Sequence, residues 1–244
     1  MSDDTALQRL PNVPRRMPAI AVKNAVIFPI PNLPIPLGVG RPRTMAAIEA
    51  AASDAAYVFV VTQRDSELER PGPADLYTYG SVCRILRMNR AADGGGELTL
   101  EGVCRGRINA FTDVDEMLAV EITPLAEIQP PGAELEALVM SLKELGERVI
   151  DLSPRLPDEA KKVLANIDDP AHLADLVGSQ LRLSTEDKQI LLAQPDVKQR
   201  LQLVIGHLAK EAEVLEISGK IRTEVRDSLD KHQREVFLRE QLRA

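Results

Sequence analysis

Few residues of this chain combine the types and spacing that catalysis requires. Residues 38–44, Gly-Val-Gly-Arg-Pro-Arg-Thr, superficially suggest a phosphate cradle at the start of a helix. The full glycine pattern is missing and Pro42 removes an amide donor, so a turn is favoured over a nucleotide site. Ser218 and Lys220 are two residues apart, which on a helix places them on different faces and argues against a Ser–Lys dyad. The sequence contains no GxxxxGK[ST] loop, HExxH pair or GxSxG elbow, so no catalytic residue is assigned.

Metal and disulfide chemistry are not indicated either. His172, His207 and His232 stand at helical positions without metal-ligand spacing. Cys83 and Cys104 are too few for a zinc site or a disulfide framework, although they lie in two segments predicted to pair as a hairpin. We therefore expect buried, reduced thiols, and no metal or cofactor in this chain.

Charge and composition narrow the class of partner. The 244 residues include 30 Lys and Arg against 37 Asp and Glu, a formal charge of −7, which disfavours a general nucleic-acid binder. The start, MSDDTALQRL, lacks the features of a secretory signal, and no apolar run approaches the ~18 residues of a membrane span. We expect a cytoplasmic protein without a membrane partner.

A cluster of arginines on the predicted hairpin is the one candidate basic surface. Glu97 and Glu101 lie on the same hairpin, so a solvated face of mixed charge is favoured over a basic stripe. The arginines are Arg84, Arg87, Arg90, Arg105 and Arg107.

The composition changes near residue 131. Thirteen of the 17 prolines and six of the seven aromatic residues lie at or before Pro131, whereas eight of the nine lysines lie after it. Pro130-Pro131-Gly132 is therefore a candidate boundary. We predict a β-rich domain at 1–131, a helical bundle at 132–194 and a long helix at 195–244, an α+β fold.

The first part has short apolar segments separated by turn residues, which is typical of strands. Pro42 opens one short helix that continues through 45–52, and residues 93–96 (Asp-Gly-Gly-Gly) predict a hairpin turn. Prolines at 29, 31, 34 and 36 cannot donate to a central ladder, so that segment is an edge or a crossing loop. These features predict a compact, partly open barrel. Its strands are expected at 18–23, 25–28, 33–37, 57–62, about 77–89, 97–108 and 117–128.

In the second part the apolar spacing changes to three and four, which predicts a helical bundle. One helix face carries Leu135, Leu138, Leu142, Leu145 and Val149. Another helix opens at Pro157 and Asp158. Asp169 before Pro170 predicts an N-cap for a helix at 170–181, and Ser184 with Asp187 predicts a capping box for 185–193.

From Pro195 onward the sequence predicts a single helix of about 50 residues, ~75 Å long. The apolar face of its second half narrows to Ile221, Val225, Leu229 and Val236, flanked by charges. Such a stripe suits a coiled-coil seam for self-association, and a solvated helix is the equal alternative. The chain stops in helical composition without a capping signal, so we expect a fragment of a longer protein.

The proline-rich segment holds the candidates for binding other proteins: Ile30, Leu33 and Ile35. Two interpretations remain open. These side chains are either core of the barrel or, if they face solvent, a patch that binds apolar segments of other chains through a sheet edge or a groove.

A series of motifs in a fixed order resembles the N-terminal region of Lon proteases, from about residue 15 to the end. In the first part they are Ala25-Val26-Ile27-Phe28-Pro29, Pro36-Leu37-Gly38-Val39-Gly40-Arg41, Val61-Thr62-Gln63-Arg64-Asp65, Asp75-Leu76-Tyr77 and Leu100-Glu101-Gly102-Val103. In the second they are Asp169-Pro170-Ala171-His172-Leu173, Lys188-Gln189-Ile190-Leu191-Leu192, Asp196-Val197-Lys198-Gln199-Arg200-Leu201 and Gln233-Arg234-Glu235-Val236-Phe237-Leu238.

This resemblance implies a bacterial, cytosolic, hexameric, ATP-dependent serine endopeptidase. Its N-terminal region recognises unfolded, damaged or tagged proteins and supports assembly in protein quality control. The resemblance also implies that the ATPase module, which uses ATP and Mg, and the peptidase module with its Ser–Lys dyad lie outside this sequence. The chain itself is then not an enzyme. A stand-alone adaptor that binds clients for a separate protease is the alternative.

Overall fold

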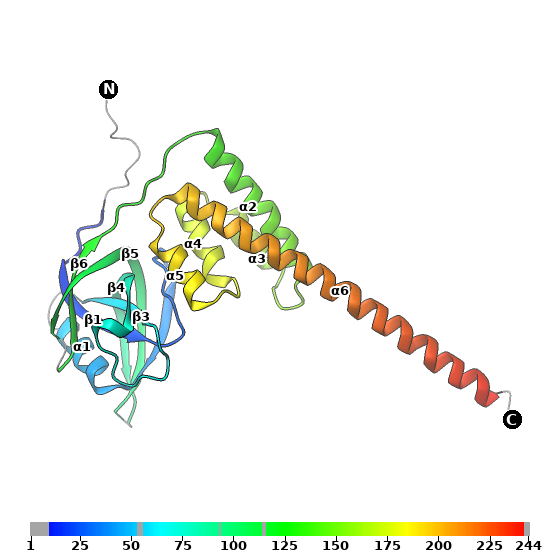
Figure 1. The fold of residues 1–244 in the computed structure, drawn as a ribbon, viewed down its shortest axis with the longest axis horizontal. Coiled ribbons are helices and arrows are strands. Elements are labelled where there is room, and N and C mark those ends of the chain that lie inside the picture. Colours follow the sequence, from blue (N-terminus) through cyan, green and yellow to red (C-terminus); the bar gives the residue numbers. More distant parts are fainter. Residues whose placement is uncertain (1–9, 53–55, 93, 114–115, 242–244) are drawn as a thin grey trace.

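The computed structural model describes residues 10–52, 56–92, 94–113 and 116–241, with side chains described as far as Leu229 except that of residue 227. The strands and α1 gather at one end of the molecule, and α2 to α6 lie at the other (Figure 1). The strands are β1 (Arg16–Val22), β2 (Pro34–Val39), β3 (Tyr57–Gln63), β4 (Leu76–Arg90), β5 (Gly96–Asp113) and β6 (Leu118–Pro124). The helices are α1 (Pro42–Ala52), α2 (Ala133–Leu152), α3 (Glu159–Ala165), α4 (Pro170–Gln180), α5 (Thr185–Ala193) and α6 (Val197–Gln241).

The sheet closes on itself through one long strand. The strand order is β2-β5-β4-β3-β1-β6, and β5 also pairs with β6, so five strands form a ring and β2 lies outside it. β1 and β3 run parallel, and the other pairs are antiparallel. β5 has 18 residues, which is long enough to pair with β2 at its start and with β6 at its end. The predicted partly open barrel of an α+β fold is confirmed.

Two glycines show how the sequence permits this sheet. Gly94 lies in the β4–β5 turn with φ +87°, a conformation that glycine adopts at little cost, and the predicted hairpin is present. Asp93 of the predicted turn lies outside the described residues. At Gly102 a Cβ atom would lie 2.6 Å from the carbonyl oxygen of Phe28, so only glycine lets residues 28–30 cross this strand so closely.

That crossing segment corrects one predicted strand. Residues 25–28 are a loop, and side chains satisfy its carbonyl groups: the Thr62 hydroxyl donates to Ala25 O at 2.6 Å and the Ser81 hydroxyl to Ile27 O at 2.6 Å. Phe28 and Ile30 then enter the apolar core of the helical part. The prolines that follow lie in and before β2, which pairs only with β5 among the described strands, so the predicted edge is confirmed.

The last predicted strand is shorter than expected. β6 ends at Pro124 rather than near 128. Ile128 instead forms a parallel bridge with Asp196, just before α6 begins.

The helices follow the caps and spacing of the sequence. The Asp169 side chain accepts from the amides of Ala171 and His172, and the Ser184 hydroxyl accepts from the amide of Asp187, so both predicted N-caps are confirmed. Leu135, Leu142 and Val149 of the predicted α2 face are buried. α6 has 45 residues, ~68 Å at the rise of an α-helix, and it projects beyond the bundle (Figure 1). No helix in the described ranges is both long and apolar enough to cross a membrane.

The two cysteines lie in different apolar clusters of the barrel. Cys83 packs with Val58 and Leu98, whereas Cys104 packs with Phe59 and Val82. Both thiols are free and buried. Burial raises the pKa of Cys83, and it raises that of Cys104 to about 12. The expected burial of both thiols is confirmed, and neither is a thiolate at neutral pH.

The assignment of Phe28 to the helical core predicts a large effect of truncation. Phe28→Ala should lower the free energy of unfolding by about 3–5 kcal/mol, because a large buried side chain leaves a cavity. The matched control is Leu86→Ala on an exposed side of β4, which should change it by less than about 0.5–1 kcal/mol. Urea denaturation measures both. Equal effects of the two variants would contradict the placement of Phe28.

Candidate binding surfaces

The three predicted client-binding residues differ in their exposure to solvent. Ile30 is only 2% exposed, so it is no candidate for partner binding and the core interpretation applies to it, although it packs in the helical core rather than in the barrel. The close crossing over Gly102 carries it there. Leu33 is 36% exposed and Ile35 is half-buried in β2. For these two residues, partner binding stays a prediction.

The β2 edge itself is poorly suited to accept another strand. Pro34 and Pro36 occupy two of its six positions and carry no N–H group. The pairing with β5 uses the other side of the strand, from Pro34 opposite Glu101 to Val39 opposite Gly96. Any partner at this edge would therefore bind mainly through side chains such as Leu33.

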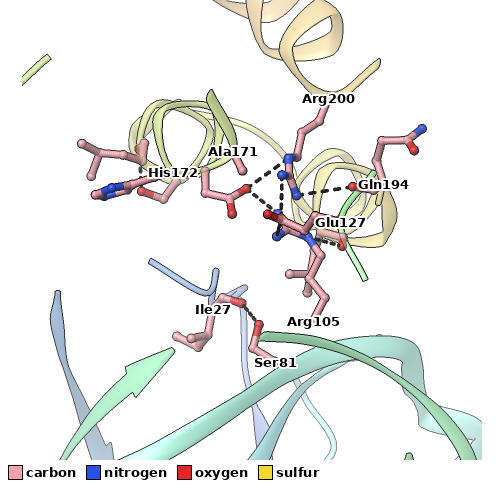
Figure 2. A network of polar contacts seen from close by, with 12 residues as sticks. Ile27, Ser81, Arg105, Glu127, Ala171, His172, Gln194 and Arg200 are labelled. Carbon is pink, nitrogen blue, oxygen red and sulfur yellow. Dashed lines mark hydrogen bonds and ion pairs between the residues drawn. The ribbon is translucent and has the colours of Figure 1, made fainter. Parts of the chain in front are cut away.

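A buried ionic cluster joins the barrel to two helices (Figure 2). Arg105 of β5 is ion-paired with Asp175 of α4 and with Glu127 at 2.7 Å, and its Nε donates to Leu192 O at 3.0 Å. Arg200 of α6 pairs with Glu127 at 2.7 Å, and its Nε lies 3.4 Å from the Asp175 carboxylate. Arg105, Asp175 and Arg200 are all buried. We call these four residues the interlobe cluster.

The interlobe cluster corrects the prediction of a solvated arginine face. The Arg105 guanidinium points towards the helices and donates to Asp175 of α4 and to Leu192 O of α5. By contrast, Arg84, Arg87 and Arg107 are exposed. Arg84 pairs with Glu101 at 2.5 Å, as a face of mixed charge implies. No local pattern could signal the role of Arg105, since its partners Glu127 and Asp175 are 22 and 70 residues away.

A second polar contact fixes α5 on the barrel. The buried Gln189 side chain donates to the Thr62 hydroxyl at 2.9 Å. Nearby, Tyr77 of β4 donates to Glu186 at 3.5 Å, and the Arg64 guanidinium lies 4.4 Å from the centre of its ring. Burial, and then the neighbouring Glu186 carboxylate, raise the pKa of Tyr77. The helices and the barrel are thus held in one arrangement by directional contacts.

An apolar groove opens in the helical part, between α2, α3, α4 and α6. Its volume is about 300 Å³, and its walls include Val149, Leu164, Val177 and Leu208. Leu156 and Val163 lie at the groove and are exposed, Val163 by 54%. We call this the helical groove. The sequence analysis missed it, because these residues have the same spacing as those of a buried helix face.

An apolar stripe follows the projecting part of α6. Its residues are 49–61% exposed: Val214, Ile217, Ile221, Val225 and Leu229. The seam predicted from the sequence comprised Ile221, Val225, Leu229 and Val236. The first three belong to this stripe, and the side chain of Val236 lies outside the described residues. Association through this stripe stays a prediction.

Together these features define a class of protein: an α+β module that presents apolar surfaces on a barrel joined to a helical bundle. Among the described residues no group of three or more His, Cys, Asp and Glu side chains is placed to hold a metal ion.

The sequence model of one protein family, the ATP-dependent protease La (LON) substrate-binding domain, matches residues 16–210. The chain therefore belongs to the Lon protease substrate-binding domain family, and the resemblance read from its motifs is confirmed.

Relatives support this membership. Lon protease 2 of Bdellovibrio bacteriovorus is 36% identical over 99% of the chain, which covers 30% of that protein. Lon protease 2 of Myxococcus xanthus is 36% identical over 96% of the chain, covering 28% of that protein. The chain thus spans less than a third of the length of these relatives.

Solved structures agree with the fold. The N-terminal domain of a Mycobacterium avium complex Lon protease matches with a TM-score of 0.64 and 26% identity, over 80% of this chain and 98% of that one. A Lon N-terminal domain protein from Xanthomonas campestris matches with a TM-score of 0.55 over 78% of this chain and 97% of that one. At 19% identity, the second match supports the fold alone.

Removal of one charge from the interlobe cluster should be costly. Asp175→Asn leaves two buried guanidinium groups with a single carboxylate, and we expect the free energy of unfolding to fall by about 3–5 kcal/mol. The control is Asp151→Asn, which removes the same charge from an exposed pair with Lys161 and should cost less than about 1 kcal/mol. Chemical denaturation compares them. An Asp175→Asn protein as stable as its control would show that the cluster contributes little.

Proposed function

We propose that this chain is the client-recognition region of an ATP-dependent Lon protease and binds apolar segments of unfolded, damaged or tagged proteins. The observation that carries the proposal is the helical groove, an apolar surface left open in a chain of the substrate-binding family. Apolar segments are buried in folded proteins and exposed in damaged ones, so a groove of this chemistry selects for loss of structure.

The size of the groove implies weak binding by a single copy. At about 300 Å³ it lies at the lower end of the range of ligand sites, ~300–1,000 Å³, and accommodates only a short stretch of a client. Several copies arranged on a ring raise the effective concentration of binding sites without a tight single site. We therefore propose that recognition depends on a hexameric assembly of the parent protein.

Catalysis belongs to the rest of the parent protein in this proposal. The chain spans about 30% of the length of its curated relatives, which are described as proteases. The ATPase module with its ATP and Mg, and the peptidase module with its Ser–Lys dyad, would follow α6, and the protein would act in the cytoplasm. The chain alone would then hydrolyse neither casein nor ATP.

A stand-alone adaptor is the second candidate function. It uses the same groove but delivers clients to a separate protease. The reading frame after Ala244 decides between the two, because a stop codon favours the adaptor and a downstream phosphate loop favours the protease.

The helical groove gives a direct test of client binding. Val163→Asp places a charge at its mouth and should weaken binding of an unfolded client such as reduced casein by about tenfold or more. The thermal melt should change little, because this side chain is largely exposed. The matched control is Ile190→Asp on α5, 55% exposed and not a wall of the groove. Fluorescence anisotropy measures the affinities.

Leu33→Asp tests the competing surface in the same assay. If Leu33→Asp weakens client binding and Val163→Asp does not, the proline-rich edge is the client site and the groove proposal is wrong.

The apolar stripe predicts self-association of the chain. Ile221→Ser together with Val225→Ser should shift the sedimentation coefficient towards the monomer, because both remove apolar area from one face of α6. Lys220→Ser with Glu224→Ser alters the same turns without reducing that area and should leave association intact. A wild-type chain that remains monomeric at 100 µM or so would contradict this prediction.

A further inference from the structure

The helical groove and the apolar stripe meet on α6. Leu208 and Glu211 of this helix are walls of the groove. Val214, the first residue of the stripe, follows Glu211 by three positions, and residues three or four apart lie on one face of a helix. Beyond Glu216 the helix projects from the bundle and carries the rest of the stripe (Figure 1). The groove therefore opens onto the stripe, and one elongated partner can cover both.

The apolar pattern of α6 is symmetric about Gly219. To within one position, three pairs of aliphatic residues lie at equal distances on either side of it: Ile217 and Ile221, Val214 and Val225, and Leu208 and Leu229. If a second copy of α6 runs antiparallel with Gly219 at the same level, the two members of each pair lie opposite each other. The pattern therefore suits a second copy of the same helix.

The charges of α6 favour an antiparallel second copy over a parallel one. The charged residues between positions 211 and 219 are Glu211, Glu213 and Glu216, the last of which also pairs with Arg148 of α2. Positions 220–226 hold three basic residues and one acidic residue: Lys220, Arg222, Arg226 and Glu224. A parallel pair brings each of these blocks beside its own copy, whereas an antiparallel pair brings the acidic block beside the basic one.

The stripe alone is too small for a stable interface. It offers five exposed aliphatic side chains, whereas a standard interface engages about 20–30 residues on each side. In the antiparallel arrangement Leu229 of one helix reaches the level of Leu208 of the other, which is a wall of the groove. Leu208 and Leu229 are ~32 Å apart along the helix, so the contact extends over stripe and groove together. A parallel arrangement leaves both grooves open.

We propose that two copies of this chain pair antiparallel through α6, so that the tip of each helix, residues 225–229, covers the helical groove of the other copy. Leu229 packs between Leu208 of α6 and the exposed Val163 of α3, two walls of that groove. This inference rests on the proposed client binding by the groove and adds its regulation, since a client must displace the second copy. In the absence of clients the pair keeps both apolar surfaces out of water.

Distances between spin labels in the 244-residue chain test the direction of pairing. Lys210→Cys and Lys220→Cys each introduce one exposed thiol for labelling, while the native Cys83 and Cys104 are buried. An antiparallel pair centred on Gly219 separates two labels at position 220 by ~3 Å along the helix axis and two labels at position 210 by ~27 Å. A parallel pair gives the same short distance at both positions.

Leu229→Ser tests whether the second copy covers the groove. This side chain is 58% exposed and is not a wall of the groove of its own chain, so it acts on client binding only through pairing. We expect a sedimentation coefficient closer to that of the monomer. At concentrations at which the wild-type chain is paired, binding of reduced casein should be about threefold or more tighter, because more grooves are open. Lys220→Ser with Glu224→Ser is the matched control and should change neither result.

Val163→Asp distinguishes failure of this proposal from failure of the proposed function. It should weaken both pairing and casein binding, because it places a charge at the mouth of the groove. Weaker pairing with unchanged casein binding would support the second copy as occupant of the groove and contradict the client role. Unchanged pairing with weaker casein binding would support the client role and contradict the covering of the groove.

Any of three further results overturns the proposal. The first is a wild-type chain that stays monomeric at 100 µM or so. The second is an equally short distance between labels at positions 210 and 220, which would indicate a parallel pair. The third is a monomeric Leu229→Ser chain that binds casein with the affinity of the paired wild type, which would show that pairing leaves the groove open.

Discussion

The interlobe cluster constrains the whole structure, because two guanidinium groups removed from water require compensation by charge and by hydrogen bonds. Each buried ion costs several kcal/mol unless its partners are well placed. Arg105 and Arg200 meet this requirement only while β5, α4 and α6 keep their positions, since Asp175 and Glu127 serve both. Apolar packing alone tolerates sliding of one element on another. A cluster of directional contacts favours a single arrangement of barrel and helices.

The direction of α6 follows from this cluster. Arg200 lies in its first turn, and the bridge between Ile128 and Asp196 fixes the residue just before the helix. Further along, Leu201, Val204 and Leu208 pack into the helical core, and Arg148 of α2 pairs with Glu216. The part of α6 beyond Glu216 is ~38 Å long and projects from the bundle, so a small change in the angle of the helix displaces its tip by several ångströms. The contacts of Arg200 with Glu127 and Asp175 therefore influence where the far end of the helix lies.

The features that could be predicted from the sequence depend on neighbouring residues. Those that could not be predicted depend on contacts between residues far apart in the chain. The caps at Asp169 and Ser184 and the turn at Gly94 depend on neighbouring residues, and the spacing of leucines in α2 depends on one helix, so all were predictable. Arg105 was misread as solvated because a charge within a strand gives no sign of a carboxylate 70 residues away. Phe28 was assigned to a strand because an apolar run reads alike whether it pairs in a sheet or crosses over one and fills a helical core. The helical groove was missed for a related reason, since residues that line an open groove and residues that fill a core share one periodicity.

The projecting part of α6 carries aliphatic side chains that the fold of this chain does not bury. Past Glu216 no described side chain of this helix is buried, so packing no longer stabilises it. A polar solvated helix of that length is sustained by pairs of opposite charge and needs no aliphatic side chains on its surface. Here aliphatic side chains recur on the exposed helix at Ile217, Ile221, Val225 and Leu229. Such a row lowers solubility without contributing to the fold, which is the cost expected of a surface that another helix covers in an assembled protein. These exposed aliphatic side chains favour the interpretation of the stripe as a coiled-coil seam over its interpretation as the face of a solvated helix.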